Sequence, residues 1–159
     1  MTDVVDQQTR SRMMAGIQGR DTKPELVVRS YLHATGLRFR LHDKRLPGRP
    51  DIVLPRYRTV VFVHGCFWHR HPGCKYATTP ASRHEFWSSK FSANVERDRR
   101  DVAALAELGW RVITVWECET RSLESVDQVF WQVVAACQPL DKPRLRRGLV
   151  EPLRPDPTW

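Results

Sequence analysis

The sequence has no run of 18 or more consecutive apolar residues, so no segment is long enough to span a bilayer as a helix. Its first residues, MTDVVDQQTRSRMM, are too polar for a secretory signal peptide. It also has no internal repeat of useful length. We therefore expect a cytoplasmic protein without membrane contact, and the length of 159 residues suits one domain with a sizeable core.

Acidic residues are scarce relative to basic ones. The chain has 18 Asp and Glu against 26 Lys and Arg, a formal charge of +8, and a pI of about 9.9. This balance suggests a polyanionic partner, although a merely soluble basic surface is an alternative. The chain also has six tryptophans. Proteins that bind nucleic acids commonly combine aromatic side chains, which contact bases, with basic residues, which contact phosphates.

Cysteine is sparse as well, with four residues in the chain. In a reducing compartment such cysteines are metal ligands or buried thiols rather than disulfides. Cys137 follows the apolar run VVAA of an expected helix, so we interpret it as a free core thiol.

The other cysteines lie near histidines in a pattern that suits zinc. Cys66, His69, His71 and Cys74 fall within nine residues, and Cys118 follows a separate apolar stretch. Zinc takes four such ligands in a tetrahedron. Cys66, His71 and Cys74 can surround one ion from a single loop, and Cys118 completes the site if the stretches 59–64 and 110–116 are neighbouring strands. The alternative is a set of partly buried cysteines beside surface histidines.

Local patterns predict alternating helices and strands. Thr22 and Glu25 form a capping box that opens a helix ending near Gly36. Further helices are expected from Ser82 and over 122–137. Another is expected from Asn94, as its cap, to Gly109, with Leu108 among the residues that face the core. Apolar runs predict strands over 37–41, 51–54, 59–64 and 110–116. Such alternation indicates an α/β fold with helices on both faces of a central sheet.

The chain divides into three regions by composition. Residues 1–20 are polar and basic and form an N-terminal arm, and residues 21–137 hold all the expected elements. Residues 138–159 are rich in proline and arginine with little to bury, and we expect a flexible tail.

Asp51 opens one expected strand after Pro50, and His64 closes the next. If the strands are neighbours, both side chains lie at one end of the sheet. A carboxylate there can hold Mg²⁺, and a histidine can move a proton near neutral pH. The alternative is that Asp51 is an ordinary turn residue.

Several motifs together resemble a known family. Pro50-Asp51 and the following strand are similar to the PD-(D/E)xK nuclease core, with Phe62 and His64 where an acid and a lysine are expected. With HGCFWHRH, LPGRPD, EFW, NVERDRRD and ELGWRVITVWEC, the chain resembles the very short patch repair (Vsr) endonucleases over roughly residues 8–120. The resemblance implies a restriction-endonuclease-like fold of three layers, with a mixed central sheet and a structural zinc site.

The resemblance also implies an activity and its residues. The family cuts one DNA strand 5′ to the thymine of a T·G mismatch, with Mg²⁺ in the active site. Carried over, Asp51 and the backbone carbonyl of Val63 would hold Mg²⁺, and His69 would be the general base. His64 and Glu25 would support it. For Glu25 the capping role remains a compatible alternative, and for His69 a place on zinc instead of His71 remains open.

The same resemblance assigns zinc ligands and DNA-intercalating residues. The zinc ligands would be Cys66, His71, Cys74 and Cys118, and the intercalating residues Phe67, Trp68 and Met14. Phe67 and Trp68 lie between Cys66 and His69 on a short loop, which favours an apolar wedge that a duplex accepts between base pairs. Ordinary core packing is the alternative for these two aromatic residues.

We therefore expect a monomer that acts on double-stranded DNA with a T·G mismatch, with mismatch-repair proteins as candidate partners. A zinc-stapled DNA-binding module without catalytic activity is the main alternative. Such a module would bind a T·G duplex and leave both strands intact. A zinc hydrolase would need an open metal position, which four protein ligands do not leave.

Overall fold

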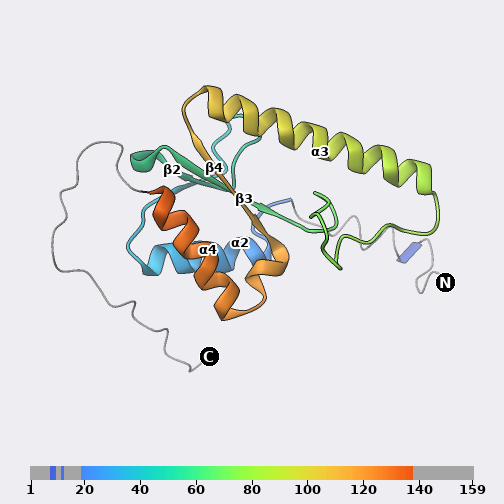
Figure 1. Ribbon diagram of the computed structural model, residues 1–159, viewed down its shortest axis with the longest axis horizontal. Coiled ribbons are helices and arrows are strands. Elements are labelled where there is room, and N and C mark those ends of the chain that lie inside the picture. Colours follow the sequence, from blue (N-terminus) through green and yellow to red (C-terminus); the bar gives the residue numbers. More distant parts are fainter. Residues whose placement is uncertain (1–7, 10–11, 13–18, 138–159) are drawn as a thin grey trace.

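A four-stranded mixed sheet forms the centre of the computed structural model, which describes residues 8–9, 12 and 19–137 (Figure 1). The strands follow the order β1-β2-β3-β4, with bounds β1 Arg40–Leu41, β2 Ile52–Leu54, β3 Thr59–His64 and β4 Arg111–Trp116. The pairs β1–β2 and β2–β3 are antiparallel, and β3–β4 is parallel, with α3 (His84–Glu107) in the connection. The predicted adjacency of 59–64 and 110–116 is confirmed.

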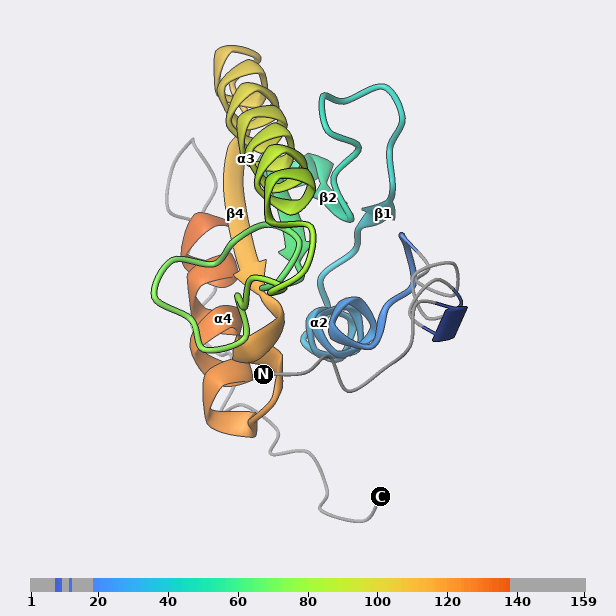
Figure 2. The same cartoon turned by 90° about the vertical axis from the view of Figure 1, so that its right-hand side faces the viewer.

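Helices cover both faces of this sheet. α2 (Lys23–Ala34) and α4 (Leu123–Ala136) lie on one face and α3 lies on the other (Figures 1 and 2). Side chains alternate along a strand, so Ile52 and Leu54 pack toward α2 and α4, while Val53 packs toward Leu105 of α3. The predicted α/β class with helices on both faces is confirmed.

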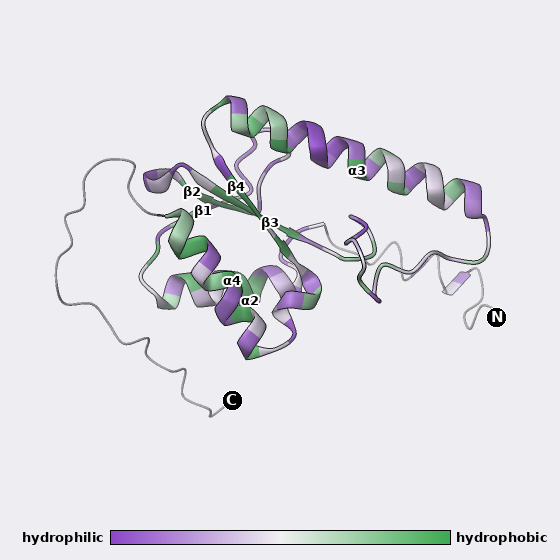
Figure 3. Cartoon of the chain, in the orientation of Figure 1, coloured by the Kyte–Doolittle hydropathy of each residue, from purple (hydrophilic) through white to green (hydrophobic). Residues whose placement is uncertain are grey.

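The central sheet is more hydrophobic than the helix α3 that covers one of its faces. Figure 3 shows apolar strands at the centre, whereas α3 carries hydrophilic residues along much of its length. Among residues 8–9, 12 and 19–137, none of the helices is long and apolar enough to cross a membrane.

The capping box predicted for α2 is present. The Glu25 carboxylate accepts hydrogen bonds from the Thr22 hydroxyl at 2.9 Å and from the Thr22 backbone N–H at 3.4 Å. Because these bonds satisfy a donor at the open end of the helix, they hold the start of α2 in place. Glu25 is nevertheless only 3% exposed, which is unusual for a capping carboxylate and ties it to the interior.

Three local predictions were wrong. α3 is one continuous helix of 24 residues, without the predicted break at Asn94. Residues 84–107 contain no glycine or proline that would end a helix before Asn94. The Asn94 amide instead donates to the Trp68 carbonyl at 3.2 Å, and its Oδ1 atom accepts from Arg97 at 3.2 Å. Leu108, expected in the core, is 52% exposed. The strand expected over 37–41 is limited to β1.

A glycine allows the turn before Asp51 to pack against α3. Gly48 has a φ of 69°, and a Cβ atom there would lie 2.9 Å from the Cβ atom of Asp101 and 3.0 Å from the Phe62 ring. Both the backbone conformation and the close approach therefore require glycine. This contact places the Pro50-Asp51 segment beside α3.

We expect Gly48→Ala to destabilise the protein more than Gly36→Ala. Gly36 has a φ of 83°, but a Cβ atom there would meet no other atom within 4 Å, so this variant isolates the backbone cost of about 1–2 kcal/mol. Gly48→Ala should add about 1–3 kcal/mol of overpacking. Urea denaturation of both variants gives the comparison, and equal losses would show that the turn moves away from α3 without cost.

Candidate active site and metal centre

The register of β3 and β4 brings distant cysteines together. His64 pairs with Trp116 in this parallel ladder, so Cys66 and Cys118 each lie two residues beyond the same pair. Cys118 lies on a short 3-10 helix, Glu117–Thr120, directly after β4. The loop after β3 turns back tightly, with backbone bonds from His71 N–H to Cys66 C=O and from Cys74 N–H to His71 C=O.

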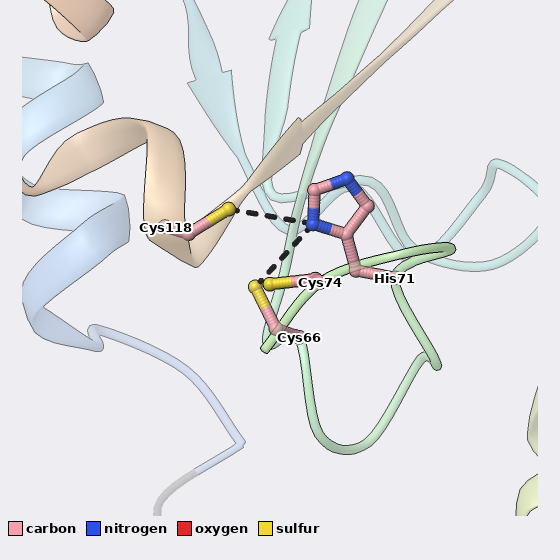
Figure 4. Close-up of side chains that lie close together, drawn as sticks. All are labelled: Cys66, His71, Cys74 and Cys118. Carbon is pink, nitrogen blue, oxygen red and sulfur yellow. Dashed lines mark hydrogen bonds between the residues drawn. The ribbon is translucent and has the colours of Figure 1, made fainter. Parts of the chain in front are cut away.

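The four predicted zinc ligands form one group, shown in Figure 4: Cys66, His71, Cys74 and Cys118. Their donor atoms lie within 4.8 Å of one another. Nδ1 of His71 is 3.7 Å from Cys66 Sγ and 3.3 Å from Cys118 Sγ. In a tetrahedral zinc site such atoms are roughly 3.5 Å apart. The group therefore fits a tetrahedral metal ion, and His69 is not part of it.

Burial disfavours the thiolate form of two cysteines in this group. It raises the pKa of the Cys66 thiol to about 12, so the sulfur stays protonated at neutral pH unless a positive charge stabilises the thiolate. Burial also raises the pKa of Cys118. A bound metal ion would supply that charge and would join the loop after β3 to the segment after β4.

Trp116 connects the metal group to two further histidines. Its ring stacks on His71, with centroids 4.3 Å apart and planes 7° apart, and meets His64 edge-on at 5.6 Å. His64 in turn stacks on His69 at 3.8 Å. The metal group and the predicted active-site histidines therefore share one continuous set of ring contacts.

Asp51 lies directly before β2 and beside Val63 of β3. Its Oδ2 atom accepts a hydrogen bond of 2.7 Å from the Val63 backbone N–H. Burial raises the pKa of Asp51 to about 6, since the Val63 bond opposes the shift only in part and the charge of Glu25 adds to it. The carboxylate is thus oriented and poorly solvated, as suits a residue that binds a cation.

His69 is held by an acid that the sequence did not single out. Nδ1 of His69 lies 2.6 Å from Oδ2 of Asp98 on α3. An ionised carboxylate can only accept, so Nδ1 carries a proton, and in the neutral ring the free lone pair is on Nε2. Burial lowers the pKa of His64 to about 4, so the stacked partner is neutral. Asp98 belongs to the NVERDRRD motif, but no spacing rule connects it to His69.

These groups lie in a cleft of about 1270 Å³ between the start of α2, the 42–51 segment, the end of β3 and α3. Glu25, Asp51 and Asp98 supply negative charge inside it. Five exposed cations also line it: Arg20, Lys23, Lys44, Arg49 and Arg97. An acidic interior with basic residues around it suits a metal ion and the phosphates of a nucleic acid.

The predicted wedge residues contact α3. Phe67 lies 5.1 Å from Phe91 and 5.7 Å from Trp87 between ring centroids, and Trp68 lies 6.0 Å from Trp87. Phe67 and Trp68 are half-buried, and Trp68 also lines the cleft. α3 thus supplies apolar partners that the short loop itself lacks. Met14 lies outside the described residues.

Comparison with known proteins agrees with this geometry. The family model described as "DNA mismatch endonuclease Vsr" matches residues 2–75. The DNA mismatch endonuclease Vsr of Escherichia coli K12 is 53% identical over 126 residues, which are 79% of this chain and 80% of that protein. The type II nicking enzyme V.XorIIP of Xanthomonas oryzae pv. oryzae is 51% identical over 127 residues, 80% of this chain and 93% of that protein.

The chain belongs to the Vsr family of DNA mismatch endonucleases. The resemblance seen in the sequence motifs is therefore confirmed. A third relative, the type II nicking enzyme V.NmeAIP of Neisseria meningitidis serogroup A, is 46% identical over 122 residues, 77% of this chain and 86% of that protein.

Membership of an endonuclease family makes the cleft the candidate active site, and the structure shows further residues in it that the sequence motifs did not identify. Among the Vsr motifs, sequence reasoning selected Asp51, His64 and His69 but missed Asp98. It also missed Arg29 and His42, which lie beside Glu25. Neither belongs to a motif that names a partner, so no local signal identified them.

We expect Cys118→Ser to lower both metal content and stability. Removing one ligand of a closed site should weaken metal binding, and folding is coupled to that binding. Elemental analysis and a thermal melt measure the two effects. Cys137→Ser is the matched control, because Cys137 is 6% exposed in the core but lies outside the metal group. Equal metal content in both variants would contradict the assignment.

Proposed function

We propose that this protein is a Mg²⁺-dependent endonuclease that nicks one DNA strand 5′ to the thymine of a T·G mismatch. Such mismatches arise when 5-methylcytosine deaminates, and a nick beside the thymine would start very short patch repair. Membership of the Vsr family supports the mismatch endonuclease activity. The observation that carries the proposal is one cleft containing Asp51, His69 and Asp98.

Mg²⁺ would be held by the Asp51 carboxylate and the backbone carbonyl of Val63. The poorly solvated carboxylate fits a hard cation that prefers oxygen ligands. When bound, the ion would supply positive charge to a phosphate oxygen and the leaving group. The ligand at position 63 is the backbone carbonyl, so the apolar side chain of Val63 does not prevent metal binding. The basic residues along the cleft would bind the DNA backbone.

His69 would accept the proton of the attacking water. Its Nδ1–H is directed to Asp98, which leaves the lone pair of Nε2 for that proton. Asp98 would stabilise the imidazolium that forms. Neutral His64, stacked on the His69 ring, would keep the ring in position without adding a competing charge.

Zinc would be structural, held by Cys66, His71, Cys74 and Cys118. It would shape the loop that presents Phe67 and Trp68 to the duplex. A mismatched step costs less to unstack than a matched one, so insertion of these rings would favour a T·G site.

The decisive experiment compares paired T·G and C·G duplexes in several flanking sequences, each with and without Mg²⁺. Nicking of the thymine strand only in the T·G duplex and only with Mg²⁺ supports the proposal. A shift of the T·G duplex in a gel without any nick would instead indicate a DNA-binding module.

Asp51→Asn should bind the T·G duplex but no longer nick it, because the neutral amide is a poor Mg²⁺ ligand. A gel shift and a nicking assay measure the two properties. Asp43→Asn is the control, since Asp43 pairs with Arg45 and is not among the cleft-lining residues. Nicking by Asp51→Asn at the wild-type rate would remove Asp51 from the mechanism.

His69→Ala should reduce the nicking rate by about 10²–10⁴-fold, the usual effect of losing a general base. Asp98→Asn should also reduce kcat, because an amide can hold the wrong tautomer of His69. Metal content and melting temperature should stay near wild type in both variants. If His69→Ala instead lost bound zinc, His69 would be a zinc ligand.

Trp68→Ala should reduce affinity for a T·G duplex more than for a matched one. Its free energy of unfolding should fall by much less than about 3–5 kcal/mol, which is the loss when a fully buried aromatic residue is truncated. Binding isotherms on both duplexes and one thermal melt test this. Trp131→Ala is the control, because Trp131 is 57% exposed on α4. A large stability loss with unchanged mismatch preference would place Trp68 in the core.

A further inference from the structure

A second group of potential metal ligands lies next to Asp51. It consists of Asp21, Glu25 and His42, whose donor atoms lie within 4.8 Å of one another. The group is adjacent to the proposed Mg²⁺ ligand, because Nδ1 of His42 is 3.7 Å from Oδ1 of Asp51. Two carboxylates and an imidazole are a donor set that can bind Mn²⁺ or Mg²⁺.

One buried side chain contacts all three members. The Arg29 guanidinium reaches Asp21 Oδ1 at 2.5 Å and Glu25 Oε2 at 2.5 Å. It also lies 2.8 Å from Nε2 of His42. Arg29 is only 8% exposed, and its Nε atom has no hydrogen-bond partner among the described residues. Burying this charge is costly, so its three contacts stabilise a specific arrangement.

These contacts use the lone pairs that a metal ion would need. Arginine is always protonated and can only donate, so Nε2 of His42 is the acceptor. Glu25 Oε2 accepts from Arg29 and from the Asp21 backbone N–H at 3.0 Å, and Oε1 accepts from the Thr22 hydroxyl at 2.9 Å. A second cation here would find the acceptor atoms of Glu25 and His42 already occupied, and it would be repelled by the charge of Arg29.

We propose that Arg29 is a built-in cation for the group of Asp21, Glu25 and His42, so that the DNA-free cleft binds no divalent metal ion there. Arg29 is a positioning residue: its contacts hold Glu25 and His42 in place, and His42 lies beside Asp51. The inference deepens the proposed function and rests on it for the metal ion at Asp51.

Mn²⁺ binding to the zinc-loaded protein, counted by electron paramagnetic resonance, tests the proposal. Arg29→Met removes the charge and keeps much of the volume, and it should bind one Mn²⁺ more than the wild type. Arg29→Met/Glu25→Gln should lose that additional ion. Arg29→Lys, which keeps a positive charge, should bind the wild-type number.

A variant that keeps Arg29 tests the proposal even if Arg29→Met does not fold. Glu25→Gln alone should bind as many Mn²⁺ ions as the wild type, and loss of an ion would overturn the proposal. An unchanged count in folded Arg29→Met would overturn it as well. As a second readout, Mn²⁺ should raise the melting temperature of Arg29→Met more than that of the wild type.

A separate variant separates this proposal from the proposed function. Asp51→Asn should lose one Mn²⁺ ion in both the wild-type and the Arg29→Met background. If Asp51→Asn retains all ions while Arg29→Met still gains one that depends on Glu25, the metal role of Asp51 fails and the role of Arg29 stands.

Discussion

The parallel pairing of β3 with β4 is the interaction on which the rest of the structure depends. These strands are separated by the long helix α3, and their register places His64 opposite Trp116. From that pair the chain continues into both halves of the metal group, through Cys66 on one side and Cys118 on the other. His64 is a member of the same pair, and the ring of His69 stacks on it. A slip of one residue would point every side chain of one strand to the opposite face and separate these donors.

Charge compensation is the second constraint, because the cleft contains several poorly solvated carboxylates. Glu25 is paired with the Arg29 guanidinium, Asp98 accepts a hydrogen bond from His69, and Asp51 accepts one from a backbone N–H, which compensates its burial only in part. Burial therefore leaves the pKa of Asp51 raised, and this residue has most to gain from a cation. The protein supplies fixed charge around Glu25, and the metal ion proposed at Asp51 would supply the charge that is missing there.

Sequence patterns predicted features that local interactions determine. The capping box of α2 depends on Thr22 and Glu25, which are three residues apart, and β3 and β4 are short apolar runs with clear boundaries. The break expected at Asn94 is absent because residues 84–107 contain no glycine or proline to end the first turns, and the Asn94 amide contacts the distant Trp68 carbonyl instead. The short β1 shows the same limit, since an isolated pattern does not reveal how much of a segment will pair.

By itself, the sequence determined the family, the fold class and the ligand types, since these depend on residue identity and short spacing. Only the tertiary structure decided which side chains act together. Asp98 is 29 residues from His69, and Arg29 is 13 residues from His42. In each pair a helix residue, Asp98 of α3 or Arg29 of α2, meets a histidine in the segment that follows a strand, and no local pattern encodes that approach. The charge on each buried group depends on those partners, so the electrostatics of the cleft is a property of the folded chain.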